Sequence, residues 1–328
     1  MKYRRLGKTD FEVSEVSLGT WQVGGGWGSA FDDETAQEIL NTAVDRGISF
    51  LDTADVYDDR ASEAAVGTLV HARSEPLRVA TQCGRRLQPH VADSYTPAAM
   101  REFVEQSLEN TGLETLDLIQ LHCPPTEVYY RPEVFEIFDR LKEEGKIRNL
   151  GVSVEKVEEG LKAIEYPGVV SVQMIYNIFR QRPADLFFGE ARARNVAVIV
   201  RVPLASGLLT GKMTRETTFD PEDHRNFNRQ GAAFDVGETF AGVPYEAALD
   251  AVEELRALVP EGVPMAAFAL RWILMEEAVS VVIPGARNPA QARANAAADE
   301  VAPLAADTIA AVREIYDRRI APHVHQRW

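Results

Sequence analysis

Three short segments, each at the carboxyl end of a predicted strand, carry residue types suited to proton transfer. They are Asp52-Thr53-Ala54-Asp55-Val56-Tyr57, Thr81-Gln82-Cys83-Gly84 and Leu121-His122-Cys123-Pro124. A phenol can donate a proton if its pKa is lowered toward neutrality, and carboxyl and imidazole groups also take part in proton transfer. The candidate catalytic residues are therefore Asp52, Tyr57, Gln82 and His122.

The same segments are poorly suited to binding a metal ion. Adjacent residues of a strand point to opposite faces, so His122 and Cys123 do not readily converge on one ion. The short-spaced ligand pairs of zinc sites are also absent. We therefore predict no metal.

The elements that position these residues repeat as a short apolar strand, a loop and a helix with apolar spacing near 3.6 residues. The predicted strands are residues 16–19, 48–53, 77–81, 117–122, 149–153, 169–173, 197–201 and 279–283. The predicted helices are residues 33–46, 61–72, 97–111, 132–144, 157–164, 183–194, and 245–258 with 266–275. Eight such units predict a (β/α)8 TIM barrel, whose active site lies where the strands end. A doubly wound open sheet is the alternative, but no Gly-x-Gly-x-x-Gly follows the first strand.

Two segments lie outside this repeat. Residues 2–6 and 11–13 flank a turn-prone Gly7-Lys8-Thr9-Asp10, which predicts an N-terminal β-hairpin. Residues 214–244 are polar and too long for an ordinary connection, so we predict a lid among long loops over the C-terminal face. No internal repeat or linker is visible, and we expect residues 1–328 to form a single domain.

Composition excludes several classes of protein. The chain has 328 residues and a net charge of -15, which disfavours binding to nucleic acid because phosphates attract a basic surface. No apolar run reaches the ~20 residues that span a bilayer, and the first residues lack the apolar segment of a signal peptide. We expect a cytoplasmic protein that does not bind membranes, with Cys83 and Cys123 as reduced thiols.

Several uncommon motifs occur in an order that resembles one family over almost the whole chain. They are Leu6-Gly7-Lys8-Thr9, Leu18-Gly19-Thr20-Trp21, the segment from Asp52 to Tyr57, Ser62-Glu63, Gly151-Val152-Ser153, Gln173, Pro203-Leu204, Gly207-Leu208-Leu209-Thr210-Gly211-Lys212 and Ile283-Pro284-Gly285-Ala286-Arg287. The chain resembles the aldo-keto reductases, above all bacterial members and the related β-subunits of voltage-gated potassium channels. The resemblance implies hydride transfer between NADP(H) and a carbonyl or alcohol substrate.

The resemblance also implies a role for each catalytic candidate. Tyr57 is the general acid, and His122 polarises and orients the carbonyl group. The family places a lysine, paired with the aspartate, where this chain has Gln82, which carries no charge. Three explanations are open: a substitution introduced to inactivate the enzyme, a natural adaptation in which His122 or an arginine carries the electrostatics, or a protein that binds cofactor without turnover.

We assign the cofactor to a set of strand ends and loops. By resemblance, Ser153 and Gln173 hold the nicotinamide carboxamide, although the usual asparagine after the serine is Val154. Arg201 can stack on the nicotinamide, and Arg287 and Gln291 are assigned to the adenosine 2′-phosphate, with Asn295 at the adenine. The full predicted set is Gly19, Thr20, Trp21, Ser153, Gln173, Tyr176, Arg201, Pro203, Leu204, Ser206, Gly207, Leu209, Lys212, Gly285, Arg287, Gln291 and Asn295.

Substrate contacts are predicted at Trp21, Trp27 and Cys123, with weaker candidates at Tyr129, Tyr130, Phe227, Phe234 and Trp328. The substrate is a small carbonyl compound or alcohol, and a sugar is compatible. Two other functions remain open: a cofactor-bound sensor or regulatory subunit, and a redox-neutral enzyme acting on a sugar. Oligomeric state is open as well.

Overall fold

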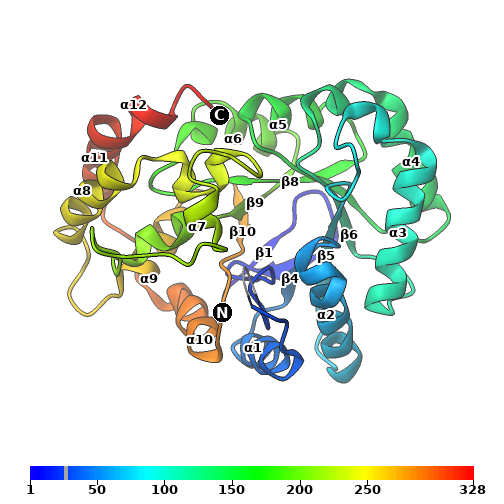
Figure 1. Ribbon diagram of the computed structural model, residues 1–328, viewed down its shortest axis with the longest axis horizontal. Coiled ribbons are helices and arrows are strands. Elements are labelled where there is room, and N and C mark those ends of the chain that lie inside the picture. Colours follow the sequence, from blue (N-terminus) through cyan, green and yellow to red (C-terminus); the bar gives the residue numbers. More distant parts are fainter. Residues whose placement is uncertain (26–28) are drawn as a thin grey trace.

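The computed structural model describes residues 1–25 and 29–328. Eight parallel strands lie side by side in the order β10-β9-β8-β7-β6-β5-β4-β3, with helices arranged around them (Figure 1). The strands are β3 (Leu18–Gly19), β4 (Phe50–Asp52), β5 (Arg78–Cys83), β6 (Leu118–His122), β7 (Leu150–Ser153), β8 (Val169–Ile175), β9 (Ala197–Arg201) and β10 (Val279–Val282). The predicted (β/α)8 barrel is confirmed.

The barrel closes where its first and last strands meet. Bridges join Val16 to Val282 and Gly19 to Gly285, and the Gly19 amide donates to the Pro284 carbonyl at 3.2 Å. A Cβ on residue 19 would lie 2.9 Å from the carbonyl oxygen of Ile283, which is too short for an unstrained contact. Glycine at position 19 therefore permits the close approach that completes the barrel.

Helices follow the strands, and their ends have recognisable causes. They are α1 (Asp33–Asp45), α2 (Ala61–Ala72), α3 (Pro97–Thr111), α4 (Pro132–Glu143), α5 (Val157–Ala163), α6 (Phe187–Ala193), α7 (His224–Phe227), α8 (Tyr245–Arg256), α9 (Met265–Leu274), α10 (Pro289–Ala296), α11 (Ala306–Ile315) and α12 (Ala321–Val324). In α3, Thr96 accepts a hydrogen bond from the Ala99 amide, Pro97 takes the first helical position, and Gly112 ends the helix with φ 67°. These are the expected start and stop signals of a helix.

The N-terminal hairpin closes the end of the barrel opposite the pocket described below. β1 (Tyr3–Arg5) pairs antiparallel with β2 (Glu12–Ser14), as predicted. Leu6, Phe11 and Val13 are buried in one apolar cluster with inward-facing residues from six barrel strands, including Phe50, Leu118 and Ile199. Burial of this cluster makes the hairpin part of the core at this end of the barrel, away from the cavity.

The predicted lid, residues 214–244, is ordered by short helical turns. It contains α7 and two 3-10 turns, Val236–Glu238 and Phe240–Gly242. The C-terminal Trp328 holds its base: the indole donates to Asp235 Oδ1 at 2.8 Å, and its ring stacks on the Arg180 guanidinium, 3.9 Å away. In Figure 1, α7 and the chain that follows it lie across the barrel strands.

The predicted strands and helices agree with the structure to within a few residues, with one exception. The helix predicted at residues 183–194 is divided into a 3-10 turn, Arg182–Ala184, and α6. Leu186 interrupts it because its backbone, with φ -142° and ψ -48°, is not helical. In the described residues, none of the helices has both the length and the apolar character required to cross a membrane.

Candidate active site

Asp52 lies at the end of β4 and is surrounded by amides. Its carboxylate accepts hydrogen bonds from Nε2 of Gln82 at 3.0 Å, of Gln120 at 3.0 Å and of Gln173 at 2.8 Å. These glutamines lie on β5, β6 and β8, and their shared hydrogen bonds to Asp52 bring the three strands' side chains together. Burial raises the pKa of Asp52 to about 7, although the three amides and, more weakly, Arg201 act in the opposite direction. The carboxyl group therefore titrates near neutrality.

Tyr57 begins the turn that follows Asp52, and the turn is strained. Asp58, Asp59 and Arg60 have φ values of 46°, 49° and 76°, a left-handed conformation that costs roughly 1 kcal/mol or more for each such residue. Arg86 braces the turn by donating to the Asp55 carbonyl at 3.2 Å and to Asp59 Oδ1 at 2.6 Å. This geometry places Tyr57 at the pocket, where its ring meets the His122 ring edge-on at 6.0 Å.

His122, at the end of β6, is fixed as a neutral imidazole. Arg85 Nη1 lies 3.3 Å from His122 Nε2, and because a guanidinium has no acceptor, Nε2 must accept this hydrogen bond. The proton of the ring is then on Nδ1, which has no partner among the described residues. Burial, followed by the positive charge of Arg85, holds the pKa of His122 well below its ordinary value.

Arg85 belongs to a buried network of two arginines and two glutamates. Its Nη2 donates to Glu238 Oε1 at 2.7 Å, and the other Glu238 oxygen lies 3.8 Å from Arg201 Nη1. Arg201 Nη2 also contacts Glu155 at 2.9 Å and the Val154 carbonyl at 3.1 Å. Burial raises the pKa of Glu238, but Arg85 and Arg201 outweigh it and keep this carboxylate ionised.

One potential metal-ligand group overlaps this network. Donor atoms of Cys123, Glu155 and Glu238 lie within 4.8 Å of one another. Arg201 already contacts all three, including Cys123 Sγ at 3.5 Å. Its guanidinium therefore supplies the positive charge that a metal ion would bring, and we propose no metal here.

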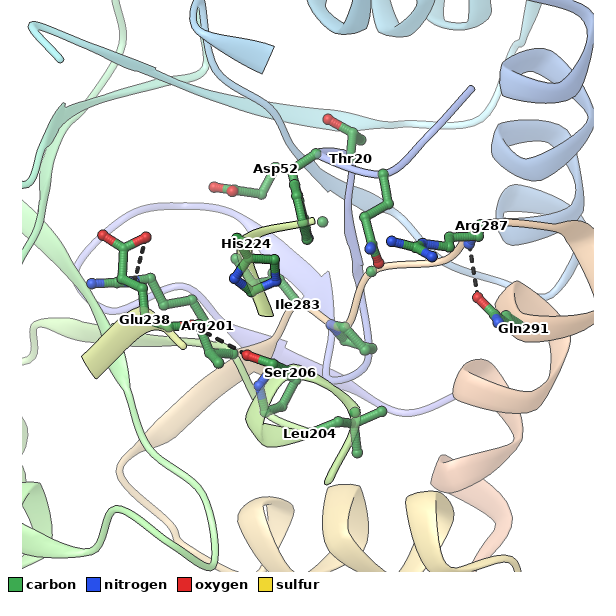
Figure 2. A pocket seen from close by; sticks show the side chains of 18 of the residues that line it. Thr20, Asp52, Arg201, Leu204, Ser206, His224, Glu238, Ile283, Arg287 and Gln291 are labelled. Carbon is green, nitrogen blue, oxygen red and sulfur yellow. Dashed lines mark hydrogen bonds and ion pairs between the residues drawn. The ribbon is translucent and has the colours of Figure 1, made fainter. Parts of the chain in front are cut away.

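A cavity of about 800 Å³ opens at the carboxyl ends of the barrel strands. Most predicted site residues line it: Asp52, Tyr57, His122, Gly19, Thr20, Trp21, Gln173, Arg201, Pro203, Leu204, Ser206, Gly207, Lys212, Gly285, Arg287, Gln291 and Asn295. Figure 2 shows Arg201 and Glu238 toward one end of the pocket, with Arg287 and Gln291 toward the other. The site therefore has an acid-base end and a long extension suited to a nucleotide.

The extension has backbone and side-chain features that fit a phosphorylated cofactor. The turn Ala205–Thr210 has left-handed φ values at Ser206 and Gly207, a geometry in which successive amides can face an anion. On the other side, the Asn288 side chain caps α10 and Gln291 Oε1 accepts from the Arg287 amide at 2.8 Å. The residues present therefore fit an anionic dinucleotide.

Five of the main predicted site residues lie outside the cavity lining: Gln82, Ser153, Tyr176, Leu209 and Cys123. The weaker substrate candidates Tyr129, Tyr130, Phe227 and Trp328 also lie outside it. Tyr176 is buried in the core, where its ring stacks on Trp272 at 5.1 Å, so the predicted contact with nicotinamide does not fit this position. Ser153 is fully buried beside Cys123, and Gln173 uses its amide nitrogen to bind Asp52. Trp27 lies outside the described residues.

The sequence reasoning missed several lining residues, above all Arg85 and Glu238, which join the catalytic end, and Arg225 beside the cofactor extension. Gly84-Arg85-Arg86 directly after β5 was a usable signal, because charged residues at a strand end face the active site of such a barrel. Glu238 lies in a polar loop, and no neighbouring sequence feature indicates that it belongs to the active site. Phe234, a weaker substrate candidate, also lines the cavity. The other lining residues not predicted as site residues are Gln22, Val56, Asp58, Asp59, Val202, Thr210, Met213, His224, Pro264, Ala266, Ile283, Pro284 and Ala294.

The barrel, its tyrosine–histidine pair and the nucleotide-sized extension define the class as an oxidoreductase-like (β/α)8 protein. Residues 15–317 match the aldo/keto reductase family, and the chain belongs to this family. Members of the family bind nicotinamide cofactors.

Three relatives illustrate the family's range. The chain is 30% identical to aldo-keto reductase YhdN of Bacillus subtilis over 90% of this chain and 87% of that protein. It is 29% identical to the NADH-specific methylglyoxal reductase of Escherichia coli, over 91% of this chain and 93% of that protein. It is 25% identical to a probable voltage-gated potassium channel β-subunit of Arabidopsis thaliana, with 93% of each chain covered.

Solved structures of the family have the same fold as this chain. The glycerol dehydrogenase of Gluconobacter oxydans superposes with a TM-score of 0.80 at 30% identity, covering 99% of this chain and 97% of that one. The holo form of an aldo-keto reductase from Bacillus halodurans gives a TM-score of 0.77 at 27% identity, covering 96% of each chain. The predicted family and its relation to channel β-subunits are therefore confirmed.

Proposed function

We propose that this protein is an NADP(H)-dependent oxidoreductase that reduces an aldehyde or ketone to an alcohol, with Tyr57 as the general acid. The observation that carries the proposal is the convergence of Tyr57 and His122, with ring centroids 6.0 Å apart, in a cavity that continues into a cationic groove. Bound NADPH would supply a hydride to the carbonyl carbon. As that bond forms, the C=O π pair moves to oxygen.

The protein's own residues complete the reaction at that oxygen. The Tyr57 hydroxyl gives its proton to the oxygen, and the tyrosinate regains a proton from solvent, so that one hydride and one proton form the alcohol. Neutral His122 lies beside Tyr57 in the cavity lining and helps to orient the carbonyl. Burial and then the charge of Asp52 raise the pKa of Tyr57, so nearby cations are needed to favour proton donation.

The preference for NADP(H) rests on the charges beside the extension. Lys212, Arg225 and Arg287 line it, and Asp223 offsets part of their charge by binding Arg225 at 2.6 Å and lying 3.8 Å from Arg287. Three cations against one carboxylate leave a surplus of positive charge for a 2′-phosphate. The Escherichia coli relative is named NADH-specific, so the preference must be measured.

The test combines cofactor binding with turnover. NADPH should bind to the wild-type protein and to Tyr57→Phe with similar Kd. The wild type should oxidise NADPH with a small aldehyde, and Tyr57→Phe should do so at least ~100-fold more slowly. Methylglyoxal and L-glyceraldehyde 3-phosphate are suitable first substrates, because two Escherichia coli relatives are reductases of these compounds. Equal turnover by the two proteins would contradict Tyr57 as the acid.

A second function, a cofactor-binding sensor with little turnover, is favoured by one feature. Asp52 is bound by three neutral amides, so the usual lysine is absent from the centre of the site, and channel β-subunits are among the relatives. Tight NADPH binding without oxidation across a broad panel of aldehydes and ketones would select this function.

A further inference from the structure

The missing cation at position 82 has a replacement in the next loop. Gln82 donates only a neutral amide to Asp52, whereas Arg85, three residues farther along the chain, lines the cavity and contacts His122 at 3.3 Å. A guanidinium is charged at every physiological pH. The positive charge has therefore moved from the strand end to the loop beside the histidine.

Contacts on three sides fix the position of Arg85. Nη1 meets His122, Nη2 binds Glu238 at 2.7 Å, and the guanidinium lies over the Phe234 ring at 5.6 Å. The side chain is about one-fifth exposed, so its field is only partly screened by water. Such a buried, pre-oriented cation can stabilise charge that develops on nearby oxygens without moving.

The lid supplies the residue that holds Arg85. Glu238 ends the turn Val236–Glu238, and its backbone carbonyl accepts from Ser206 Oγ at 3.2 Å. Arg201 lies 3.8 Å from its second carboxylate oxygen. Ser206 belongs to the loop assigned to the cofactor, so Glu238 links the lid to that loop through its backbone carbonyl and to His122 through Arg85.

We propose that Arg85, positioned by Glu238 of the lid, provides the positive charge that the family's lysine would otherwise supply to Tyr57 and to the reacting oxygen. Arg85 acts through His122 and through its field, and it is therefore a positioning residue. The proposal rests on the proposed reductase function. It also predicts that the lid must be in place for efficient proton donation by Tyr57.

The electrostatic surroundings agree with this assignment. Arg85 and Arg201 are the cations that lower the pKa of Tyr57 against the effects of burial, Asp52 and Glu238. The charged or titratable groups that act on His122 are Arg85, Glu238, Arg201 and His90. Of these groups, Arg85 is the one hydrogen-bonded to the histidine.

The experiment is a double-mutant cycle between positions 85 and 82. NADPH Kd, kcat and KM for one aldehyde are measured from pH 6 to pH 9 for wild type, Arg85→Gln, Arg85→Lys, Gln82→Lys and the double variant. Arg85→Gln should lower kcat by roughly 10–100-fold with NADPH Kd changed by less than about 2-fold. Arg85→Lys should retain more activity than Arg85→Gln, because it keeps the charge.

Rescue separates electrostatics from folding. Gln82→Lys should restore about 10-fold or more of kcat in the Arg85→Gln background, and a larger factor there than in the wild type. A purely structural Arg85 would not respond to a lysine placed on β5. Glu238→Gln should lower kcat less than Arg85→Gln, because the guanidinium stays but is held less firmly. Arg101→Gln, which removes an exposed ion pair between Arg101 of α3 and Glu144 at the end of α4, is the control and should leave kcat unchanged.

An NMR measurement keeps this proposal distinct from the proposed reductase function. In the wild type, ¹⁵N shifts should show His122 protonated at Nδ1, and Arg85→Gln should raise the pKa of His122. If the protein binds NADPH without turnover but His122 responds in this way, the reductase function fails and the coupling of Arg85 to His122 stands. A kcat for Arg85→Gln within about 2-fold of wild type, or no restoration by Gln82→Lys, would overturn the role of Arg85.

Discussion

A lysine at position 82 should increase turnover. In the structure, Gln82 Nε2 lies 3.0 Å from Asp52 Oδ1, so a lysine ammonium can pair with this carboxylate. Two unit charges about 4 Å apart interact by ~4 kcal/mol at an effective dielectric constant of about 20. Asp52 would neutralise much of that field, and we expect ~1–2 kcal/mol to remain for the developing tyrosinate. That amount corresponds to roughly a 10-fold increase in kcat.

The assay follows NADPH oxidation at pH 7 with a simple aldehyde. Gln82→Met is the matched control, because it has a similar length but neither charge nor hydrogen-bond donor, and it should be no faster than wild type. Circular dichroism and NADPH Kd confirm that each variant folds and binds cofactor. Turnover of Gln82→Lys that is unchanged or lower than wild type, with binding intact, would refute the missing-cation reasoning.

Three further predictions test the cofactor groove, the buried carboxyl group and the closure of the barrel. Arg287→Ala should weaken NADPH about 10-fold or more but NADH little; titration of both cofactors checks this, and equal weakening would remove the 2′-phosphate assignment. Because the pKa of Asp52 is raised to about 7, its folded form keeps a proton that the unfolded chain releases near pH 4. Between pH 5 and pH 8, the free energy of unfolding of the wild type should therefore fall by ~2–3 kcal/mol relative to that of Asp52→Asn, as measured by urea unfolding. If the difference between the two free energies does not change with pH, the pKa of Asp52 is not raised. Gly19→Ala should lower the free energy of unfolding by about 1–3 kcal/mol, because the added Cβ would lie 2.9 Å from the Ile283 carbonyl oxygen. The control is Gly189→Ala, at a helical position with open space around it. This change should raise the free energy of unfolding by ~0.5–1 kcal/mol in the same assay.

The barrel could be predicted because each of its elements carries a local signal. Apolar runs such as residues 197–201 are buried along their whole length as β9, and Thr96-Pro97 marks the start of α3. The division of the predicted helix at 183–194 could not be foreseen. It depends on the backbone of Leu186, which packing decides rather than helix propensity.

The site was predictable where one segment carries the chemistry, and less so where side chains meet from distant segments. Tyr57 lies in the turn after β4 and His122 is the last residue of β6, and both line the cavity. Gln173 was assigned to the cofactor, but its amide donates to Asp52 from 121 residues away. Arg85 and Glu238 are 153 residues apart in the chain, so no local pattern could reveal that the lid holds an arginine against the catalytic histidine.

The location of that arginine has a consequence for how the reaction is controlled. A lysine on a barrel strand is held by the core and is present whether or not the lid is ordered. Arg85 follows the end of β5, and its anchor Glu238 belongs to the lid, so our proposal makes the position of the charge depend on contact between the lid and the barrel. Lid opening would remove the anchor of the cation from the side of His122, and proton donation by Tyr57 would slow at the same time. Turnover in this protein should therefore depend on lid closure through the charge of Arg85 as well as through the exclusion of water.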